Sequence, residues 1–439
     1  MRLPSLTTLI GDEIEGDRKW SSFVDGGDGF FYGIPYFARR VVKFNPLDKS
    51  MTEIGPDLGE LGCKWICGVL ANTGSIYCAP CNADHILKID TIQGTVETLD
   101  GVELPETGDH LLWASGALAR DNHIYYMPSQ AYRIMRLNPD NDSLSSVGDD
   151  LGEGYKYKGT VVGNDDHVYG IPYRATRIVK FDLTNPDTTS TVGKEAEEWF
   201  MCGNGVLGGD GYIYAANGDG QVLQIDTTNS DYTWIGDRIY SEAAWGDPIV
   251  GVDECIYWPP SRANRVLKFD PETQQLPSFV GDDLGGGALD KWWSGALARD
   301  GVIYCIPFCS SRVLVIDPFK EFSGTLQSNM PLYPQELGRL FLKDEGCDET
   351  FFESSLRKFG CDKVFELIEE CLPLDAEWAG ANNHGNLPPF VVAASCENCA
   401  TSVIYYLLRR NVNALLTNYN DDEDSTIPNK KRKLHVGGN

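Results

Sequence analysis

The stretch Ile303-Tyr304-Cys305-Ile306-Pro307 belongs to a set of seven similar segments, and the regular spacing of these segments decides the fold. Each segment begins with an Ile-Tyr-like pair, and successive tyrosines lie 43 to 48 residues apart. A period of this length accommodates four short antiparallel strands joined by tight turns, which is the unit of a propeller blade. The seven pairs are Phe31-Tyr32, Ile76-Tyr77, Ile124-Tyr125, Val168-Tyr169, Ile213-Tyr214, Ile256-Tyr257 and Ile303-Tyr304.

The residues around each pair predict the strands of a blade. The Ile-Tyr run is rich in β-branched and aromatic residues, and a proline follows the tyrosine by three residues in six of the seven copies. Because proline cannot donate to a sheet ladder, the strand ends there, and a Val-Leu-Lys-Phe-Asp-like strand follows after a turn. The fifth repeat lacks the proline and turns at Gly218-Asp219-Gly220 instead. A Gly-x-Leu-Ala-like strand precedes each pair, and a fourth strand ends in Ile-Gly or Val-Gly.

The two ends of the repeat region predict how the ring closes. After Asp317 the seventh repeat has no fourth strand of the usual kind, whereas Leu6-Thr7-Thr8-Leu9-Ile10-Gly11 matches that missing strand. We therefore expect the N-terminal strand to complete the last blade, which removes exposed sheet edges at the closure. The predicted fold is mainly β, a seven-bladed β-propeller over residues 1–327 that is closed by the N-terminal strand.

The repeats resemble seven-bladed propellers of the Kelch-like and YVTN-like kind in the broad sense, and they lack the Gly-His and Trp-Asp marks of WD40 repeats. The resemblance covers roughly residues 1–325. It implies a rigid toroid with loops on two faces.

The C-terminal part follows a different pattern. Helical spacing begins after about Ser328, and the run Pro388 to Ala394, followed by Val403 to Leu408, resembles one ankyrin repeat. We predict a small α-helical, ankyrin-like module over residues 328–418 and a disordered acidic and basic tail over residues 419–439. The basic run of the tail resembles a single-cluster nuclear localisation signal, which implies an importin-type receptor as a partner: Lys430, Lys431, Arg432 and Lys433.

Composition narrows the classes of partner. The formal net charge of −27 disfavours affinity for nucleic acid or anionic membrane and suits a basic protein partner, although acidity can also serve solubility alone. No run of 18 apolar residues occurs, and the first residues do not read as a signal peptide, so we expect an intracellular protein, cytoplasmic or nuclear. The thirteen cysteines are odd in number and form no repeating pairs, which favours reduced thiols.

One recurring position is mostly cationic and is a candidate ligand-binding position. It lies eight residues after each tyrosine, or seven in the shortened fifth repeat. These side chains either converge on a shared pocket and hold carboxylates or phosphates, or each pairs locally within its own or the next blade. They are Arg40, His85, Arg133, Arg177, Gln221, Arg265 and Arg312.

A second recurring position, twelve residues before the tyrosine, is a large aromatic residue. It has two interpretations, core packing between blades or a rim on which a sugar or peptide side chain stacks. The candidates for such a rim are Trp65, Trp113 and Trp292, and the equivalent residues are Trp20, Tyr157 and Trp245.

Other chemistry has little support in the sequence. Gly-Asp turns such as Gly148-Asp149-Asp150 and Gly281-Asp282-Asp283 contain carboxylates that could bind calcium. They lack the closely spaced oxygen ligands of a dedicated calcium-binding loop. Cys78 and Cys81 have C-x-x-C spacing but no second pair, and no nucleophile, P-loop or H-E-x-x-H motif occurs. We predict no catalytic residue, no metal site and no cofactor.

Three functions remain open from the sequence. The leading hypothesis is a non-enzymatic protein-interaction scaffold that uses propeller loops and the helical module, with a basic partner. The first alternative is a propeller that binds carbohydrate or a small anion through the aromatic and cationic positions. The second is a metal-assisted hydrolase or lactonase with its site in the central channel.

Overall fold

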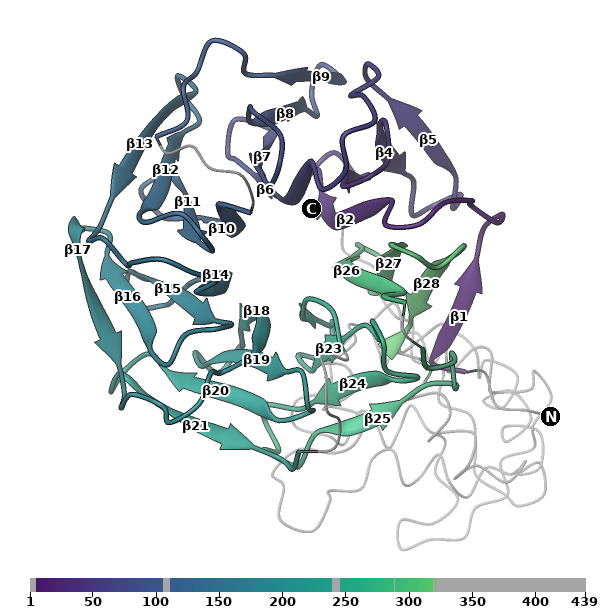
Figure 1. The fold of residues 1–439 in the computed structure, drawn as a ribbon. Coiled ribbons are helices and arrows are strands. Elements are labelled where there is room, and N and C mark those ends of the chain that lie inside the picture. Colours follow the sequence, from purple (N-terminus) through teal and green to yellow (C-terminus); the bar gives the residue numbers. More distant parts are fainter. Residues whose placement is uncertain (1–4, 106–110, 239–244, 288, 319, 321–439) are drawn as a thin grey trace, which may run out of the picture. The chain divides into compact units, whose positions relative to one another are not determined.

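Seven four-stranded antiparallel sheets form a closed ring around a central axis (Figure 1). The computed structural model describes residues 5–105, 111–238, 245–287, 289–318 and 320. The predicted ankyrin-like module, the tail and its basic run lie outside the described residues, and the proposed boundary at residue 327 stays a prediction. Within the described part of the chain, no helix has the length and apolar character needed to cross a membrane. The predicted seven-bladed propeller is confirmed.

Each blade contains four strands, with the first strand nearest the axis and the fourth at the rim, and the strands follow chain order in six of the seven blades. The first four blades comprise β2 Trp20–Asp25, β3 Phe31–Pro35, β4 Val41–Phe44 and β5 Met51–Ile54; β6 Trp65–Leu70, β7 Ser75–Pro80, β8 Leu87–Asp90 and β9 Thr95–Thr98; β10 Trp113–Leu118, β11 Ile124–Pro128, β12 Ile134–Asn138 and β13 Ser143–Val147; β14 Tyr157–Val162, β15 His167–Pro172, β16 Ile178–Asp182 and β17 Asn185–Val192. The remaining three comprise β18 Cys202–Leu207, β19 Ile213–Asn217, β20 Val222–Asp226 and β21 Asp231–Ile235; β22 Ile249–Val250, β23 Ile256–Trp258, β24 Val266–Phe269 and β25 Ser278–Val280; and β26 Trp292–Leu297, β27 Ile303–Pro307, β28 Val313–Ile316 and β1 Thr7–Ile10.

The seventh blade takes its strands from both ends of the propeller. Strand β1 pairs antiparallel with β28, in a register that runs from Thr7 opposite Ile316 to Ile10 opposite Val313. Leu6, just before β1, is buried in the same core cluster as Leu314 and Ile316. The predicted closure by the N-terminal strand is therefore confirmed.

The repeated tyrosines lie in the core and anchor a turn. In most blades the tyrosine hydroxyl donates to an aspartate four residues earlier, as Tyr169 does to Asp165 at 2.7 Å and Tyr257 does to Asp253 at 2.8 Å. Tyr77 has no aspartate at that position and donates instead to Asp142 of the next blade at 2.6 Å. Because a buried hydroxyl without a partner is costly, the aspartate lets a large aromatic side chain fill the blade interior.

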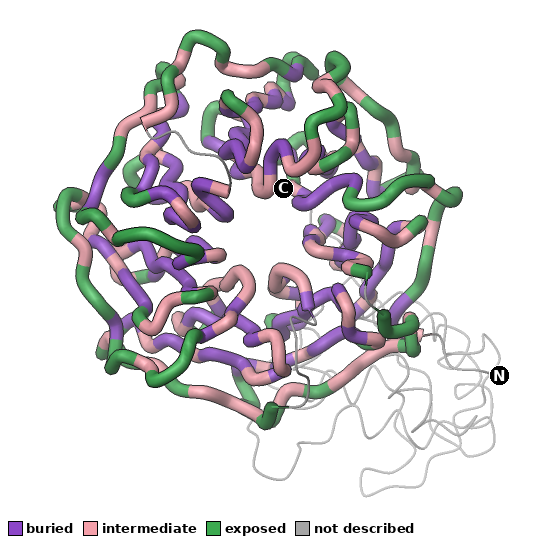
Figure 2. The backbone as a smooth tube through the Cα atoms, viewed as in Figure 1, coloured by how far each residue is buried: buried purple, intermediate pink, exposed green. Residues whose placement is uncertain are grey.

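Burial follows the same radial order. The second strand of each blade is buried on both faces, as the pattern of β3, β11 and β27 shows. The rim strands, such as β5, contain exposed and partly exposed residues (Figure 2). A sheet covered on both sides by neighbouring blades is expected to have apolar residues at successive positions, which is why the Ile-Tyr-x-Ile runs do not alternate with polar residues.

Main-chain hydrogen bonds join the blades at one end of the ring. In the described part of the chain, the residue after the proline donates in most blades to the carbonyl of the residue before the first-strand aromatic, as Tyr36 does to Lys19 at 2.9 Å. The residue before the first-strand aromatic of the next blade then donates to the carbonyl of that post-proline residue, as Lys64 does to Tyr36 at 3.0 Å. The same alternation recurs in Lys156 to Ser129, Tyr173 to Lys156, Met201 to Tyr173, Lys291 to Ser261, Phe308 to Lys291 and Lys19 to Phe308. We call this series the main-chain belt.

Two leucines near the N-terminus test the closure of the ring. Leu6 is 7% exposed and Leu9 is 41% exposed, although only three residues separate them. Leu6→Ala should lower the free energy of unfolding by about 2–4 kcal/mol because it opens a cavity where β1 meets β28, whereas Leu9→Ala should cost less than about 0.5 kcal/mol. Chemical denaturation of both variants measures this difference. Equal effects of the two substitutions would contradict the closure.

Candidate functional site

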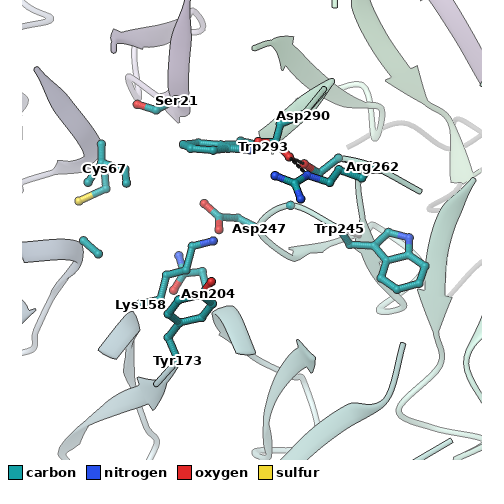
Figure 3. Close-up of a pocket in the computed structure, with 14 residues that line it drawn as sticks. Ser21, Cys67, Lys158, Tyr173, Asn204, Trp245, Asp247, Arg262, Asp290 and Trp293 are labelled. Carbon is teal, nitrogen blue, oxygen red and sulfur yellow. Dashed lines mark hydrogen bonds and ion pairs between the residues drawn. The ribbon is translucent and has the colours of Figure 1, made fainter. Parts of the chain in front are cut away.

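A cavity of about 180 Å³ lies in the centre of the ring (Figure 3). Charged side chains from three blades line it, Lys158 from β14, Asp247 just before β22, and the pair Arg262 and Asp290. Trp293 of β26 completes this side of the cavity. The cavity is therefore polar and charged, with aromatic surface beside the charges.

Most residues that line the cavity come from one repeat position. The one or two residues that follow the first-strand aromatic face the axis, and in most blades the ladder has a bulge there, as between Tyr157 and Gly159. A bulge adds a residue on one strand and re-aims its side chain, so this position can point inward while the strand stays paired. The lining residues at this position are Ser21, Ile66, Cys67, Ala114, Lys158, Asn204, Gly246, Asp247 and Trp293.

Lys158 and Asp247 are opposite charges whose side chains point toward each other in the cavity (Figure 3). The Lys158 ammonium attracts the Asp247 carboxylate electrostatically, but the described residues show no direct ion pair at 4.0 Å or less between them. The ammonium lies 5.6 Å from the ring centre of Tyr173 and 5.8 Å from that of Trp293. The two charges therefore influence each other without direct contact.

The backbone holds Asp247 in position. Its own N–H donates to the carbonyl of Trp293 at 2.6 Å, and the nearby backbone of Asn204 lowers the pKa of its carboxyl group. Desolvation within the channel raises the pKa of Asp247 to about 6, and the nearby Lys158 ammonium opposes this shift. The pKa of the neighbouring Cys67 thiol rises to about 12, mainly through burial and partly through Asp247, so this thiol stays neutral.

The other polar side chains of the cavity have local partners. Arg262 Nε donates to Asp290 Oδ1 at 2.8 Å, and the Ser261 hydroxyl donates to the same oxygen at 3.0 Å. The Ser21 hydroxyl donates to the carbonyl of Trp65 at 3.0 Å. Because these hydroxyls already donate to structural hydrogen bonds, the charged side chains of the cavity are the groups left to bind a ligand.

Aromatic rings form one wall at the belt end of the cavity. Trp293 stacks on Phe308 with ring centres 3.8 Å apart, and Tyr36 packs edge-on against Trp293 at 5.6 Å. One face of the Trp293 indole is therefore covered by protein. Since Trp293 also lines the cavity, a face or edge of this ring is available to a ligand.

The cationic repeat position is directed to local partners. Arg133 donates to the carbonyl of Gly148 at 2.8 Å, Gln221 to that of Gly236 at 3.0 Å, and Arg40 to that of Gly55. Arg177 pairs with Glu195 at 2.6 Å and Arg312 with Glu13 at 3.3 Å.

His85 and Arg265 contribute their carbonyls to tryptophan indoles, and the Nδ1 atom of His85 is buried without a partner in the described part of the chain. The lining of the central cavity comes from other positions, so the structure does not bring this set together there. A ligand role for any of these residues stays a prediction.

The aromatic repeat position packs between blades. Trp65, Trp113 and Trp292 are 3%, 0% and 1% exposed. Each donates its indole N–H to the carbonyl of the cationic position twenty residues later, as Trp113 does to Arg133 at 3.2 Å. The two repeat positions that the sequence singles out are therefore hydrogen-bonded to each other. A stacking role would require these rings to be exposed.

Four lysines, three of them buried and Lys291 partly buried, escaped the sequence interpretation. Each precedes a first-strand aromatic, and its ammonium donates to main-chain carbonyls, as Lys64 does to Leu61 at 2.9 Å and Lys291 does to Ala263 at 2.7 Å. Burial lowers the pKa of Lys64 and of Lys291. The signal was present as a recurring dipeptide: Lys19-Trp20, Lys64-Trp65, Lys156-Tyr157 and Lys291-Trp292.

The Gly-Asp turns use their carboxylates locally. Asp150 and Asp283 each accept a backbone N–H two residues later, from Gly152 at 2.8 Å and from Gly285 at 2.9 Å. Among the described residues, no group of three or more His, Cys, Asp or Glu side chains is placed to hold a metal ion. The Gly-Asp sequence therefore recurs because the aspartate side chain stabilises the turn by accepting a backbone N–H.

Similarity to other proteins is limited to the fold. No family model matches the sequence, and no curated protein matches it. A streptogramin B lyase structure aligns with a TM-score of 0.58 at 14% identity, over 70% of this chain and 97% of that chain. A catalytically inactive virginiamycin B lyase from Staphylococcus aureus, crystallised with quinupristin, gives a TM-score of 0.58 at 13% identity, over 70% and 98% of the two chains.

The extracellular domain of a one-component system from B. thetaiotaomicron gives a TM-score of 0.53 at 10% identity, over 70% of this chain and 40% of that one. At these identities the similarities show a shared propeller architecture.

Two glycines at the same repeat position test the packing of the cavity wall. A Cβ atom on Gly246 would lie 2.3 Å from the carbonyl oxygen of Trp293, whereas one on Gly203 would meet nothing within 4 Å. Gly246→Ala should therefore destabilise the fold by about 2 kcal/mol or more through overpacking against backbone, while Gly203→Ala should be close to neutral. Thermal unfolding compares the two. Similar melting temperatures would contradict the described approach of the blades.

The ionisation of Asp247 should affect stability in one direction. Its pKa in the folded protein, about 6, exceeds the ordinary value of 3.8, so the folded state binds the proton more tightly than the unfolded chain does. Asp247 therefore costs no stability below about pH 4 and becomes destabilising as the pH rises through about 6. Asp247→Asn should raise the free energy of unfolding by about 1–2 kcal/mol at pH 8 and change it little at pH 4. A gain of equal size at both pH values would contradict this account.

Proposed function

We propose that this chain is a non-enzymatic protein-interaction scaffold that binds a basic partner on one face of its propeller. That face, here the proline face, consists of the turns after each second strand and the connections from each fourth strand to the next blade. The main-chain belt and the aromatic wall of the cavity lie at this same end of the ring. The observation that carries the proposal is the distribution of exposed apolar side chains.

Exposed large hydrophobic side chains are concentrated on the proline face. Of the ten in the described part of the chain, six lie in its loops, three lie in turns of the opposite face, and Leu9 lies on β1. Trp199 is 57% exposed and Phe37 is 40% exposed, and tryptophan in particular is rarely left in water without a partner. The six are Phe37, Leu61, Tyr132, Tyr155, Trp199 and Leu289.

Carboxylates surround these apolar side chains. The connections that enter the first strands carry exposed acidic residues in several blades. This arrangement, with a net charge of −27 for the whole chain, favours a partner segment rich in Lys and Arg. The exposed acidic residues of these connections include Glu13, Glu15, Asp17, Glu60, Asp149, Asp150, Glu153, Glu195, Glu197, Glu198, Asp282 and Asp283.

One part of the proline face already holds a cation among aromatic rings. The Arg174 guanidinium lies 5.6 to 5.8 Å from the ring centres of Tyr155, Tyr173 and Trp199. Aromatic faces attract cations through their quadrupoles, and tryptophan does so most strongly. The exposed part of the Trp199 ring, which Arg174 does not cover, can receive a Lys or Arg side chain of the partner, with Glu197 and Glu198 adjacent in sequence.

A face-specific pair of variants tests the scaffold. Trp199→Ala should weaken partner binding at least about tenfold because exposed tryptophans at interfaces are frequent hot spots. Leu276→Ala, on the opposite face and 68% exposed, serves as the matched control and should leave binding unchanged. Quantitative affinity capture from a cell extract, repeated across a salt series, measures both effects, and capture of the basic partner should fall as salt rises.

The identity of the captured proteins decides between the candidate functions. Basic proteins retained by the wild type and by Leu276→Ala, and lost with Trp199→Ala, support the proposal. Retention that is insensitive to Trp199→Ala, or that selects acidic proteins, contradicts it. Specific retention on a glycan array in place of protein capture would favour the carbohydrate alternative, and turnover that depends on an added divalent metal would favour the hydrolase alternative.

A further inference from the structure

The central cavity contains a cation whose charge has no direct partner. The Lys158 ammonium makes no hydrogen bond or ion pair to any described residue, and its nearest aromatic ring centres are 5.6 and 5.8 Å away. The buried lysines of the belt differ, because carbonyls hold their ammonium groups, as in the bond from Lys156 to Gly152 at 2.7 Å. A half-buried ammonium without a counter-charge at contact distance is unfavourable. A ligand that supplies an anionic group would remove this cost.

The Asp247 carboxylate limits which anion can bind. The backbone N–H of Asp247 donates to the carbonyl of Trp293, and its side chain lines the same cavity as Lys158 (Figure 3). A simple anion at Lys158 would be repelled by Asp247, and a simple cation at Asp247 would be repelled by Lys158. The charge pattern therefore favours a ligand that carries both charges and has no net charge.

We propose that the central cavity binds a small zwitterion, with the ligand carboxylate on Lys158 and its protonated amine on Asp247 beside the Trp293 ring. Free α-amino acids are the simplest members of this class. Lys158 and Asp247 form no direct ion pair at 4.0 Å or less, so each charge can take a partner from a ligand whose carboxylate and amine share one short skeleton. The charged pair of this site lies in the channel, although proline-face loops contribute Tyr173, Arg262 and Asp290 to its lining.

The size and aromatic surface of the cavity agree with this class of ligand. Its volume of about 180 Å³ lies below the roughly 300 Å³ at which sites for drug-sized molecules begin. Phe308 covers the Trp293 indole from one side at 3.8 Å and fixes its orientation. A protonated amine held between Asp247 and this ring gains both a charge-assisted hydrogen bond and a cation–π contact.

Binding of defined probes to the full chain tests the site. Isothermal titration calorimetry should use glycine, L-alanine, L-serine and L-phenylalanine as zwitterions, with acetate and methylamine as the two half-ligands. At least one amino acid should bind at least about tenfold more tightly than either half-ligand, since each charge-assisted contact contributes more than about 1.4 kcal/mol. The N-acetyl amide of the best ligand, which has lost both charges, should not bind.

Two pairs of variants assign the contacts. Lys158→Met and Asp247→Asn should each weaken binding of the amino acid at least about tenfold. Lys194→Met and Asp187→Asn change the same residue types at exposed positions and should leave the affinity unchanged. Because Asp247→Asn is expected to stabilise the folded protein at neutral pH, loss of binding in that variant cannot be due to unfolding.

Three results would overturn the proposal. The first is the absence of a heat signal for all four amino acids at concentrations up to about 10 mM, far above ordinary small-ligand affinities. The second is binding of acetate as tight as that of the amino acid, which would make the cavity an anion site. The third is an affinity that is unchanged in both Lys158→Met and Asp247→Asn. Partner capture that depends on Trp199 is measured separately, so failure of one function leaves the other distinguishable.

Discussion

The main-chain belt is the constraint on which the positions of the other functional residues depend. Its donors and acceptors are backbone groups, so the described bonds form in blades whose side chains at these positions differ. Tyr36 and Tyr173 are held in this way between the blade they belong to and the next one. Because these bonds are made at the end of the ring where the cavity is lined, they fix the distances between side chains that come from different blades. The buried lysines reinforce the same end by donating to loop carbonyls.

Residues at different positions of the repeat serve different purposes, because some stabilise the blades and others line the channel. Residues that recur, such as Trp113 and Arg133, bond to one another and to the local backbone, and they define the blade. Residues that differ among blades at the position after the aromatic define the channel, where Lys158, Asp247 and Trp293 meet. A symmetrical scaffold can thus present an asymmetrical site, because the bulge at this position has the same geometry in blades with different side chains.

The blade count, the strand positions and the closing strand were all predictable from the sequence, because each depends on local patterns that recur seven times. The tyrosine, the proline and the Ile-Gly ends each mark a strand boundary with a physical cause. The channel residues were not predictable in this way. Lys158 and Asp247 each occur in a single blade. Only an alignment of the repeats on the first-strand aromatic shows that both side chains lie at the channel. A search for recurring residues finds the residues that build the blades instead.

The dependence of the last blade on both ends of the propeller has a consequence during synthesis. Thr7–Ile10 leaves the ribosome before every other strand of the ring, whereas its partner Val313–Ile316 is the last strand of the ring to be translated. The nascent chain therefore carries an unsatisfied strand while the other blades are produced, and pairing with it is a late event in co-translational folding. A product that stops before β28 leaves both β1 and the edge of β27 open to pairing with other chains, so chaperone protection is most needed in that interval.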